Sequence, residues 1–305
     1  MAKAPGLAAL ALIVNALVWG LSWWPFKHLQ VLGLHPLWAT AVVYALALAV
    51  LSLRVPHGWP RLLRTPWLWA LAAASGFTNV GFNWAVTTGD VVRVVLLFYV
   101  MPVWSVPLAW WLLGERPRRA ALLRLALALI GVALVLHAPG QGLPWPLGLA
   151  DALALLGGFC FALTNALLRR LRAEPEAGRM LAMFAGGALF ALVTALAGRG
   201  LGHVSALPEW SPALIGPTLG LALAFLVGNL CLQYGAARLP ASTTALIMLS
   251  EVVFASVSAS LAGEAAITPR VLSGGALILG AALLASLPSP NPAPASSART
   301  PEPSP

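Results

Sequence analysis

Ten apolar segments, each about as long as a helix that crosses a lipid bilayer, occupy almost all of this 305-residue chain. A helix needs about 20 apolar residues to span the hydrocarbon core, where the backbone must satisfy its own hydrogen bonds. We therefore predict an all-α integral membrane protein with ten transmembrane helices. The expected spans are 6–26, 36–54, 66–86, 91–113, 119–138, 147–168, 180–198, 211–236, 241–262 and 270–287.

Composition supports the bilayer as the solvent for this chain. Charged residues make up 9% of the sequence, against about 25% in ordinary soluble domains. A soluble protein with so few charges would expose large apolar patches. The net charge of +9 lies in short basic runs between apolar segments, so we expect no nucleic-acid partner. The Pro- and Ser-rich tail, 288–305, is expected to be disordered.

Lysine and arginine are distributed unevenly between the two sets of loops. Only Lys27, Arg93, Arg199 and Arg270 fall on one side, and the other fourteen of the 18 fall on the opposite side. Cytoplasmic loops carry the excess of these residues. We therefore predict a multi-pass protein of the bacterial inner (plasma) membrane with both termini in the cytoplasm.

The two halves of the chain carry matching residues at nearly one offset. The pairs, 149 or 150 residues apart, are Glu115 with Glu264, Gly131 with Gly280, and Asn79 with Asn229. This pattern predicts a duplicated five-helix unit, 6–138 and 147–287. Because five is odd, the second unit enters the membrane from the opposite side. Such inverted repeats are typical of secondary transporters, whose binding site lies near the midplane between the repeats.

Four stretches resemble signature motifs of the EamA family in the drug/metabolite transporter superfamily. They are "WGLSWWPFK" in the first segment, "MPVWSVPLAWWLLGERP" in the fourth, "LSEVVFASVSASLAGE" in the ninth and "GGALILGAALL" in the tenth. The resemblance covers residues 6–287. It implies ten helices in two inverted EamA repeats, and export of small metabolites, often amino acids, from bacterial cytoplasm. The family often has Glu-Pro in the ninth helix, where this chain has Val252. Pro102, which matches Glu251 at the 149 offset, predicts a break in the fourth helix.

Glu251 is the first candidate site residue, because it lies near the middle of an apolar span. A carboxylate there costs at least ~2.5–3.5 kcal/mol unless it faces a cavity or a partner. Its functional roles would be proton coupling or a counter-charge for a substrate amine. The alternative is a hydrogen-bonded structural acid between helices.

Further polar and aromatic residues are predicted to line a central cavity. Asn79 and Asn83 share one helical face, as do Asn229 and Gln233, and Trp84 and Tyr234 follow them. Hydrogen bonding between helices would explain the same amides equally well. The remaining candidates are Trp19, Ser22 and Trp23 in the first helix, Arg93 and Tyr99 in the fourth, and Thr164 and Asn165 in the sixth.

Arg93 has two interpretations from the sequence. It could hold a substrate carboxylate near the outer face. Alternatively it pairs with Asp90, which we predict to cap the fourth helix, or its side chain extends to the headgroups.

The sequence favours transport over catalysis. It has no His-Glu-x-x-His motif, P-loop or nucleophile elbow, so we predict no enzyme, no cofactor and no metal site. The expected function is a secondary transporter that exports small organic metabolites by alternating access, with proton coupling as an option. A flippase for lipids or lipid precursors and a structural membrane protein are the alternatives. The expected partners are a small-molecule substrate and membrane lipids, and a homodimer is one option for assembly.

Overall fold

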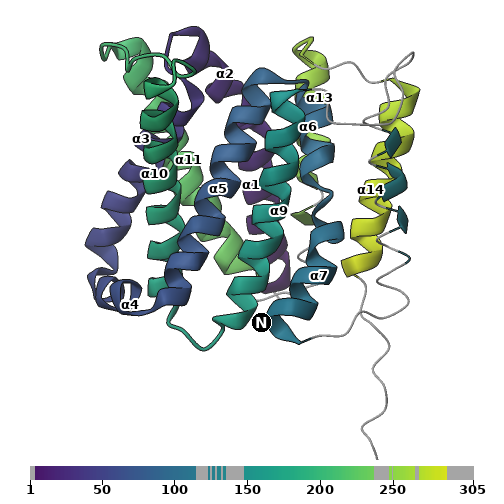
Figure 1. Cartoon of the computed structure of the whole chain (residues 1–305), viewed down its shortest axis with the longest axis horizontal. Coiled ribbons are helices and arrows are strands. Elements are labelled where there is room, and N and C mark those ends of the chain that lie inside the picture. The colour runs from purple at the N-terminus through teal and green to yellow at the C-terminus, as the bar shows by residue number, and fades with distance from the viewer. Residues whose placement is uncertain are drawn as a thin grey trace, which may run out of the picture.

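The structure, a computed structural model, is a bundle of helices that run mostly along one direction (Figure 1). It describes residues 4–114, 148–236, 247–248, 250–264 and 268–286, with scattered helical positions between 123 and 134. In chain order the elements are α1 (Ala4–Leu21), α2 (Trp23–Val31), α3 (Pro36–Arg54), the 3-10 turn η1 (Pro56–Gly58), α4 (Trp59–Arg64), α5 (Pro66–Thr88), α6 (Val91–Phe98), α7 (Met101–Leu113), α9 (Leu149–Arg170), α10 (Glu176–Gly200), α11 (Pro212–Ala236), α13 (Ser250–Leu261) and α14 (Pro269–Ser286).

The prediction of an all-α membrane protein is confirmed for the described residues. Six helical stretches are long and apolar enough to cross a bilayer: Gly6–Val31, Pro36–Arg54, Val91–Leu113, Leu149–Arg170, Glu176–Gly200 and Pro212–Leu232. In addition, α5, α13 and α14 lie within or over the third, ninth and tenth expected segments. Most of the fifth segment, 119–138, and the tail, 288–305, lie outside the described residues. The count of ten helices therefore stays a prediction.

Two of the predicted spans are interrupted inside the bundle. The first passes from α1 to α2 at Ser22, whose hydroxyl donates to the carbonyl of Trp19 at 2.7 Å, and Pro25 follows without an amide hydrogen. The fourth span consists of two helices: α6 ends at Phe98 and α7 begins at Met101. Pro102 lies in the first turn of α7, so the break predicted from this proline is present.

A row of aromatic rings fills the centre of the bundle. Trp19 of α1 stacks on Phe225 of α11 with ring centroids 4.6 Å apart, and its edge meets Phe82 of α5 at 6.4 Å. Phe225 also contacts Tyr44 of α3, and Phe82 contacts Phe98 at the end of α6. These contacts connect five helices through the middle of the protein.

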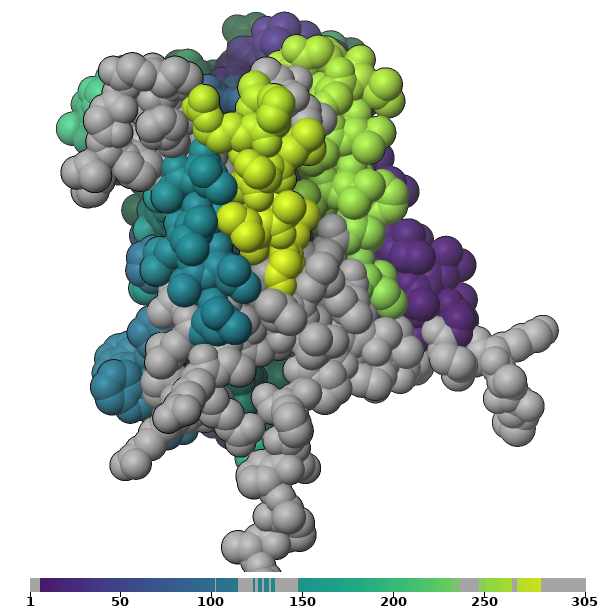
Figure 2. All heavy atoms as spheres, turned by 90° about the vertical axis from the view of Figure 1, so that its right-hand side faces the viewer, coloured from purple at the N-terminus to yellow at the C-terminus, as the bar shows by residue number. Residues whose placement is uncertain are grey.

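The described part of the fifth segment packs against α14. Figure 1 shows these short fragments beside α14, and Figure 2, which looks onto this end of the bundle, shows α14 in yellow next to α13. A Cβ added at Gly131 would lie 2.7 Å from the carbonyl oxygen of Gly274 and 2.8 Å from a side-chain carbon of Ile278. Helices in membranes approach this closely through small residues.

Glycines bring the backbones of α5 and α10 close together. A Cβ added at Gly186 would overlap the carbonyl oxygen of Ala72, and one added at Gly76 would lie 2.5 Å from the carbonyl oxygen of Gly186. Both obstacles are backbone atoms, which cannot rotate away as a side-chain end could. The distance between these two helices therefore depends on the glycines.

We expect Gly186→Ala to lower the thermal unfolding temperature of the purified protein strongly. Overpacking in a core usually costs about 1–3 kcal/mol, and here two helix backbones must separate. The matched control is Gly216→Ala in α11, because a Cβ at Gly216 meets no atom within 4 Å. Thermal unfolding in detergent provides the measurement. Equal unfolding temperatures for the two variants would contradict the packing argument.

Candidate functional site

Glu251 and Tyr99 meet in the buried centre of the protein. Glu251 lies in the first turn of α13 and is 7% exposed. Its Oε2 accepts a hydrogen bond from the Tyr99 hydroxyl, 2.9 Å away. Tyr99 occupies the break between α6 and α7 and is itself buried. Two residues that the sequence singled out, 152 positions apart, thus form one polar site where a helix is interrupted.

The first helix runs alongside the ninth span next to this site. Asn15 is completely buried in α1, and its Nδ2 donates to the sulfur of Met248 at 3.3 Å. One turn further along, a Cβ at Gly20 would lie 2.8 Å from the carbonyl oxygen of Glu251. Gly20 therefore lets α1 pack directly on the backbone that carries the carboxylate. The "WG" of the sequence motif has a physical role in this contact.

The contact continues to the ends of α2 and α13. Trp23 donates from Nε1 to the hydroxyl oxygen of Ser258 at 3.0 Å. Beyond it, the Lys27 ammonium pairs with the Glu264 carboxylate at 2.5 Å, with side chains 20% and 44% exposed. We call these two contacts, Trp23–Ser258 and Lys27–Glu264, the α2–α13 latch. It joins α2 to α13 and to the residues that follow α13.

Arg93 makes an ion pair that the sequence did not predict. Its Nε and Nη2 donate to the two oxygens of Asp151 in the first turn of α9, at 2.9 and 2.8 Å. Asp151 is 7% and Arg93 20% exposed at the side chain. Asp90 caps α6 as predicted, since its carboxylate accepts the backbone N–H of Arg93 at 2.8 Å. The guanidinium thus binds a carboxylate of a different helix, and this pair joins α6 to α9.

The two amides of α5 bond to α3. Tyr44 donates its hydroxyl to Asn79 Oδ1, and Asn79 Nδ2 donates to the carbonyl of Ser75. Asn83 Nδ2 donates to the Thr40 hydroxyl at 3.0 Å. In this conformation they make the interhelical contacts that were the alternative to a cavity role. Their exposure to a water-filled space stays a prediction.

The other candidates are distributed over the bundle. Trp84 is partly buried and meets His35 edge-on at 5.3 Å. Asn229 and Tyr234 are partly buried on α11, and the side chain of Gln233 lies outside the described residues. Thr164 is buried in α9 and Asn165 is exposed. Asn165 lines a hollow of about 820 Å³ between the ends of α7 and α9, together with Arg169, Arg170 and Arg172.

Several residues of these contacts were missed by the sequence analysis as site residues, among them Asn15, Lys27, Asp151, Ser258 and Glu264. Asn15 could have been found, because a polar side chain in the middle of an apolar span needs a partner. Lys27 belongs to the quoted motif of the first segment. Its partner is 237 positions away, and no local pattern connects such residues. Among the described residues, no three His, Cys, Asp or Glu side chains gather to form a metal site.

Together, the apolar spans and the buried polar contacts define a multi-pass membrane protein. The family model of the EamA-like transporter family matches residues 6–137 and again 148–287. The chain belongs to this family, and it is a membrane transport protein.

Curated relatives carry transporter names or the name RarD. Protein RarD of Streptomyces exfoliatus is 31% identical over 78% of this chain and 74% of its own length. Protein RarD of Salmonella typhi is 27% identical over 59% of this chain and 60% of its own length. An uncharacterized transporter of Pseudomonas aeruginosa is 37% identical over 47% of this chain and 49% of its own length. The chain thus spans less than two thirds of the last two relatives.

A solved crystal structure shares the fold. It covers 91% of this chain and 96% of its own, with a TM-score of 0.55 and 23% sequence identity.

Proposed function

We propose that this protein is a secondary transporter that exports small organic metabolites across the bacterial inner membrane by alternating access, with Glu251 as its proton-coupling group. The observation that carries the proposal is the buried contact between Glu251 and Tyr99 at the break between α6 and α7. An ionisable residue inside a membrane is costly, and such residues mark substrate or proton pathways. Interrupted helices near the midplane form the sites of many transporters.

The ion pairs support the proposed orientation. If both termini are cytoplasmic, Lys27, Glu264, Arg93 and Asp151 all belong to the outer side, and they pair with one another as Lys27–Glu264 and Arg93–Asp151. The Arg61–Glu174 pair joins two loops on the inner side. Each pair thus connects residues to which the lysine and arginine bias assigns the same side.

The packing of the helices supports an inverted repeat. In the proposed duplication, the first span corresponds to the sixth, the third to the eighth, and the fourth to the ninth. The contact of α1 with α11 then has its counterpart in α9 with α5, and the contact of α1 with α13 in α9 with α6 and α7. All of these contacts are present, so the two halves are packed in related ways.

The α2–α13 latch and the hollow near Asn165 suggest which state the structure represents. In the proposed orientation the latch closes the outer end, whereas the hollow of about 820 Å³ lies at the inner end of α7 and α9. Alternating access requires that the two ends do not open together. We assign this conformation to the state with a closed outer side, so that the latch must separate before a solute leaves the cell.

Cross-linking the latch is expected to stop transport. We expect the Lys27→Cys, Glu264→Cys variant, in a background without Cys160 and Cys231, to lose transport when a bis-methanethiosulfonate cross-linker joins the two thiols, and to recover it with a thiol reductant. A cross-linker is used because these two residues meet through long side chains, and a direct disulfide needs Cα atoms within about 7 Å. Each single cysteine variant, treated with the same reagent, is the control and should keep its transport. Full transport by the cross-linked pair, with the link verified by mass spectrometry, would exclude a gating role.

The solute is identified from the metabolites that accumulate in the growth medium of cells with and without the protein. Untargeted metabolite profiling of cells that produce the protein, against cells that carry the empty expression vector, should show one or a few small metabolites accumulating outside only where the protein is produced. Identical medium profiles would reject export as the function. Profiles that differ in lipids alone would favour the flippase alternative.

A further inference from the structure

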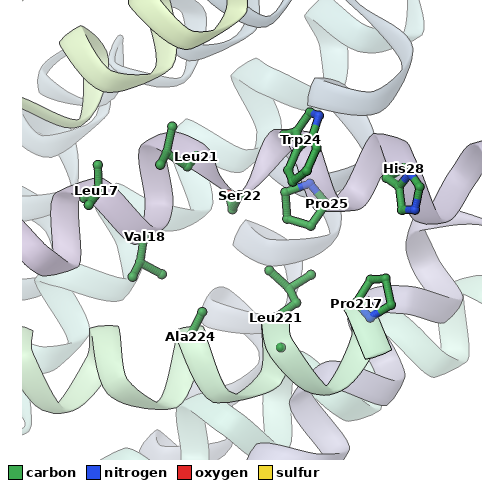
Figure 3. Close-up of a pocket in the computed structure, with 11 residues that line it drawn as sticks. Leu17, Val18, Leu21, Ser22, Trp24, Pro25, His28, Pro217, Leu221 and Ala224 are labelled. Carbon is green, nitrogen blue, oxygen red and sulfur yellow. The ribbon is translucent and has the colours of Figure 1, made fainter. Parts of the chain in front are cut away.

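A cleft of about 520 Å³ opens on the side of the bundle between α1–α2 and α11 (Figure 3). One wall runs along α1 and α2 from Leu17 to His28, and the other along α11 from Pro217 to Ala224. The volume is within the roughly 300–1,000 Å³ of ordinary ligand pockets. Nearly all of its lining is apolar, and the polar groups among the lining side chains belong to Ser22, His28 and the indole of Trp24.

The cleft faces the hydrocarbon of the membrane. Both of its walls belong to spans long and apolar enough to cross a bilayer. Trp24 is 65% exposed at its rim, and Leu17 and Leu21 are each 38% exposed. In a membrane these surfaces contact lipid, so the cleft is open sideways to the bilayer. A polar solute would lose its hydration there without gaining hydrogen bonds.

The length of the cleft corresponds to one leaflet. From Leu17 to His28 the wall rises by roughly 16 Å, at 1.5 Å per residue. That is about half of the ~30 Å hydrocarbon thickness. Leu17 lies near the level of Gly20, which packs on Glu251, and His28 lies toward the end of the span. The cleft thus extends from the middle of the membrane to one surface, as a single acyl chain does.

The glycine in the α11 wall gives the cleft its width. A Cβ added at Gly220 meets no atom within 4 Å, so the space over this residue is open. Pro25 and Pro217 lie on opposite walls, as Figure 3 shows, and neither has an amide hydrogen with which to continue its helix ladder. The gap therefore lies between the interruption of α1 and α2 on one side and a missing side chain on the other.

We infer that this cleft binds one acyl chain of a membrane phospholipid, with the headgroup at the His28 end. In the proposed orientation that is a lipid of the outer leaflet. The chain already lies in hydrocarbon, so it gains no transfer energy from water; it gains van der Waals contacts with both walls of a gap that would otherwise hold no partner atoms. His28 and the adjacent headgroup region offer polar contacts at the mouth. The inference does not depend on which solute the protein transports.

A photoreactive lipid tests the inference. The protein is reconstituted in vesicles of phosphatidylethanolamine and phosphatidylglycerol that contain a phosphatidylethanolamine with a diazirine in one acyl chain, and the labelled peptides are mapped by mass spectrometry. We expect several-fold more label on 17–28 and 217–224 than on 189–196. The last segment is the internal control, because Leu189, Leu192, Val193 and Leu196 of α10 are also exposed and do not line the cleft.

Filling the cleft should remove the extra label. Gly220→Leu is expected to reduce labelling of the cleft to the level of α10, whereas Gly216→Leu, on the same helix and also in open space, should leave it unchanged. Ala224→Leu, one turn along the same wall, replaces Gly220→Leu if that variant does not fold. Undiminished label after filling, or equal label on α10 in the unmodified protein, would overturn the inference. Absence of cleft label together with a dimer that Gly220→Leu dissociates would assign the cleft to a second copy of the chain.

Discussion

Glu251→Gln is expected to abolish solute accumulation driven by a pH gradient while leaving the protein folded. Glutamine keeps the shape of the side chain and can still accept the hydrogen bond from Tyr99, which lies 2.9 Å from Glu251 Oε2. It cannot bind and release a proton. A bound proton shifts the equilibrium between the two conformations of the transporter only if it binds one of them more tightly. A variant that binds no proton therefore keeps both conformations and loses the coupling.

The measurement is uptake into proteoliposomes of the metabolite identified by profiling, with and without an imposed pH gradient. We expect gradient-driven accumulation by Glu251→Gln to fall at least about tenfold, which corresponds to a loss of about 1.4 kcal/mol of coupling free energy. Exchange of solute without a gradient should continue. The matched control is Glu176→Gln, which changes an exposed acid in the first turn of α10 and should behave like the unmodified protein. Normal accumulation by Glu251→Gln would make Glu251 a structural acid.

Tyr99→Phe distinguishes the role of the Glu251 carboxyl group from that of the hydroxyl that donates to it. It removes the hydroxyl that donates to Glu251 and leaves the carboxylate in place. If Glu251 carries the proton, this variant should still couple, with a shifted pH dependence of uptake. Loss of coupling equal to that of Glu251→Gln would indicate that the pair acts as one unit.

The sequence predicted those features of the structure that depend only on residues close together along the chain. The all-α architecture follows from the length of the apolar runs, the break of the fourth span from Pro102, and the cap of α6 from Asp90. The position of Glu251 inside the bundle follows in the same way, because a carboxylate within an apolar span must face a partner or a cavity. These features are local, so one segment of sequence contains the information.

The partners of the polar residues could not be predicted in this way. A helical period shows which residues share a face, but it does not show which helix the face contacts. Arg93 and Asp151 are 58 positions apart, and Lys27 and Glu264 are 237 apart. The amides of α5 illustrate the same limit, since their spacing fitted both a cavity and a helix contact. In the structure they bond to Tyr44 and Thr40 of α3.

Removal of Arg93 is expected to have the largest effect on stability. Asp151 is 7% exposed at the side chain, and its two oxygens both accept hydrogen bonds from the guanidinium. Removing one partner of a buried ion pair costs about 3–5 kcal/mol, because it leaves an uncompensated charge. We therefore expect Arg93→Ala to lower the unfolding temperature of the detergent-purified protein strongly. Arg93→Lys should have an intermediate effect, because lysine keeps the charge and loses the two-point geometry.

The double variant Arg93→Ala, Asp151→Ala distinguishes the two roles of Arg93. If the arginine serves mainly to join α6 to α9, removing both charges should recover much of the stability lost in Arg93→Ala, and transport should recover with it. The two single effects would then be far from additive. If instead Arg93 also holds a carboxylate of the solute, the double variant should regain its unfolding temperature and remain inactive. Recovery of neither property would mean that the pair contributes less than the other contacts of these two residues, and the structural role assigned to it would be wrong.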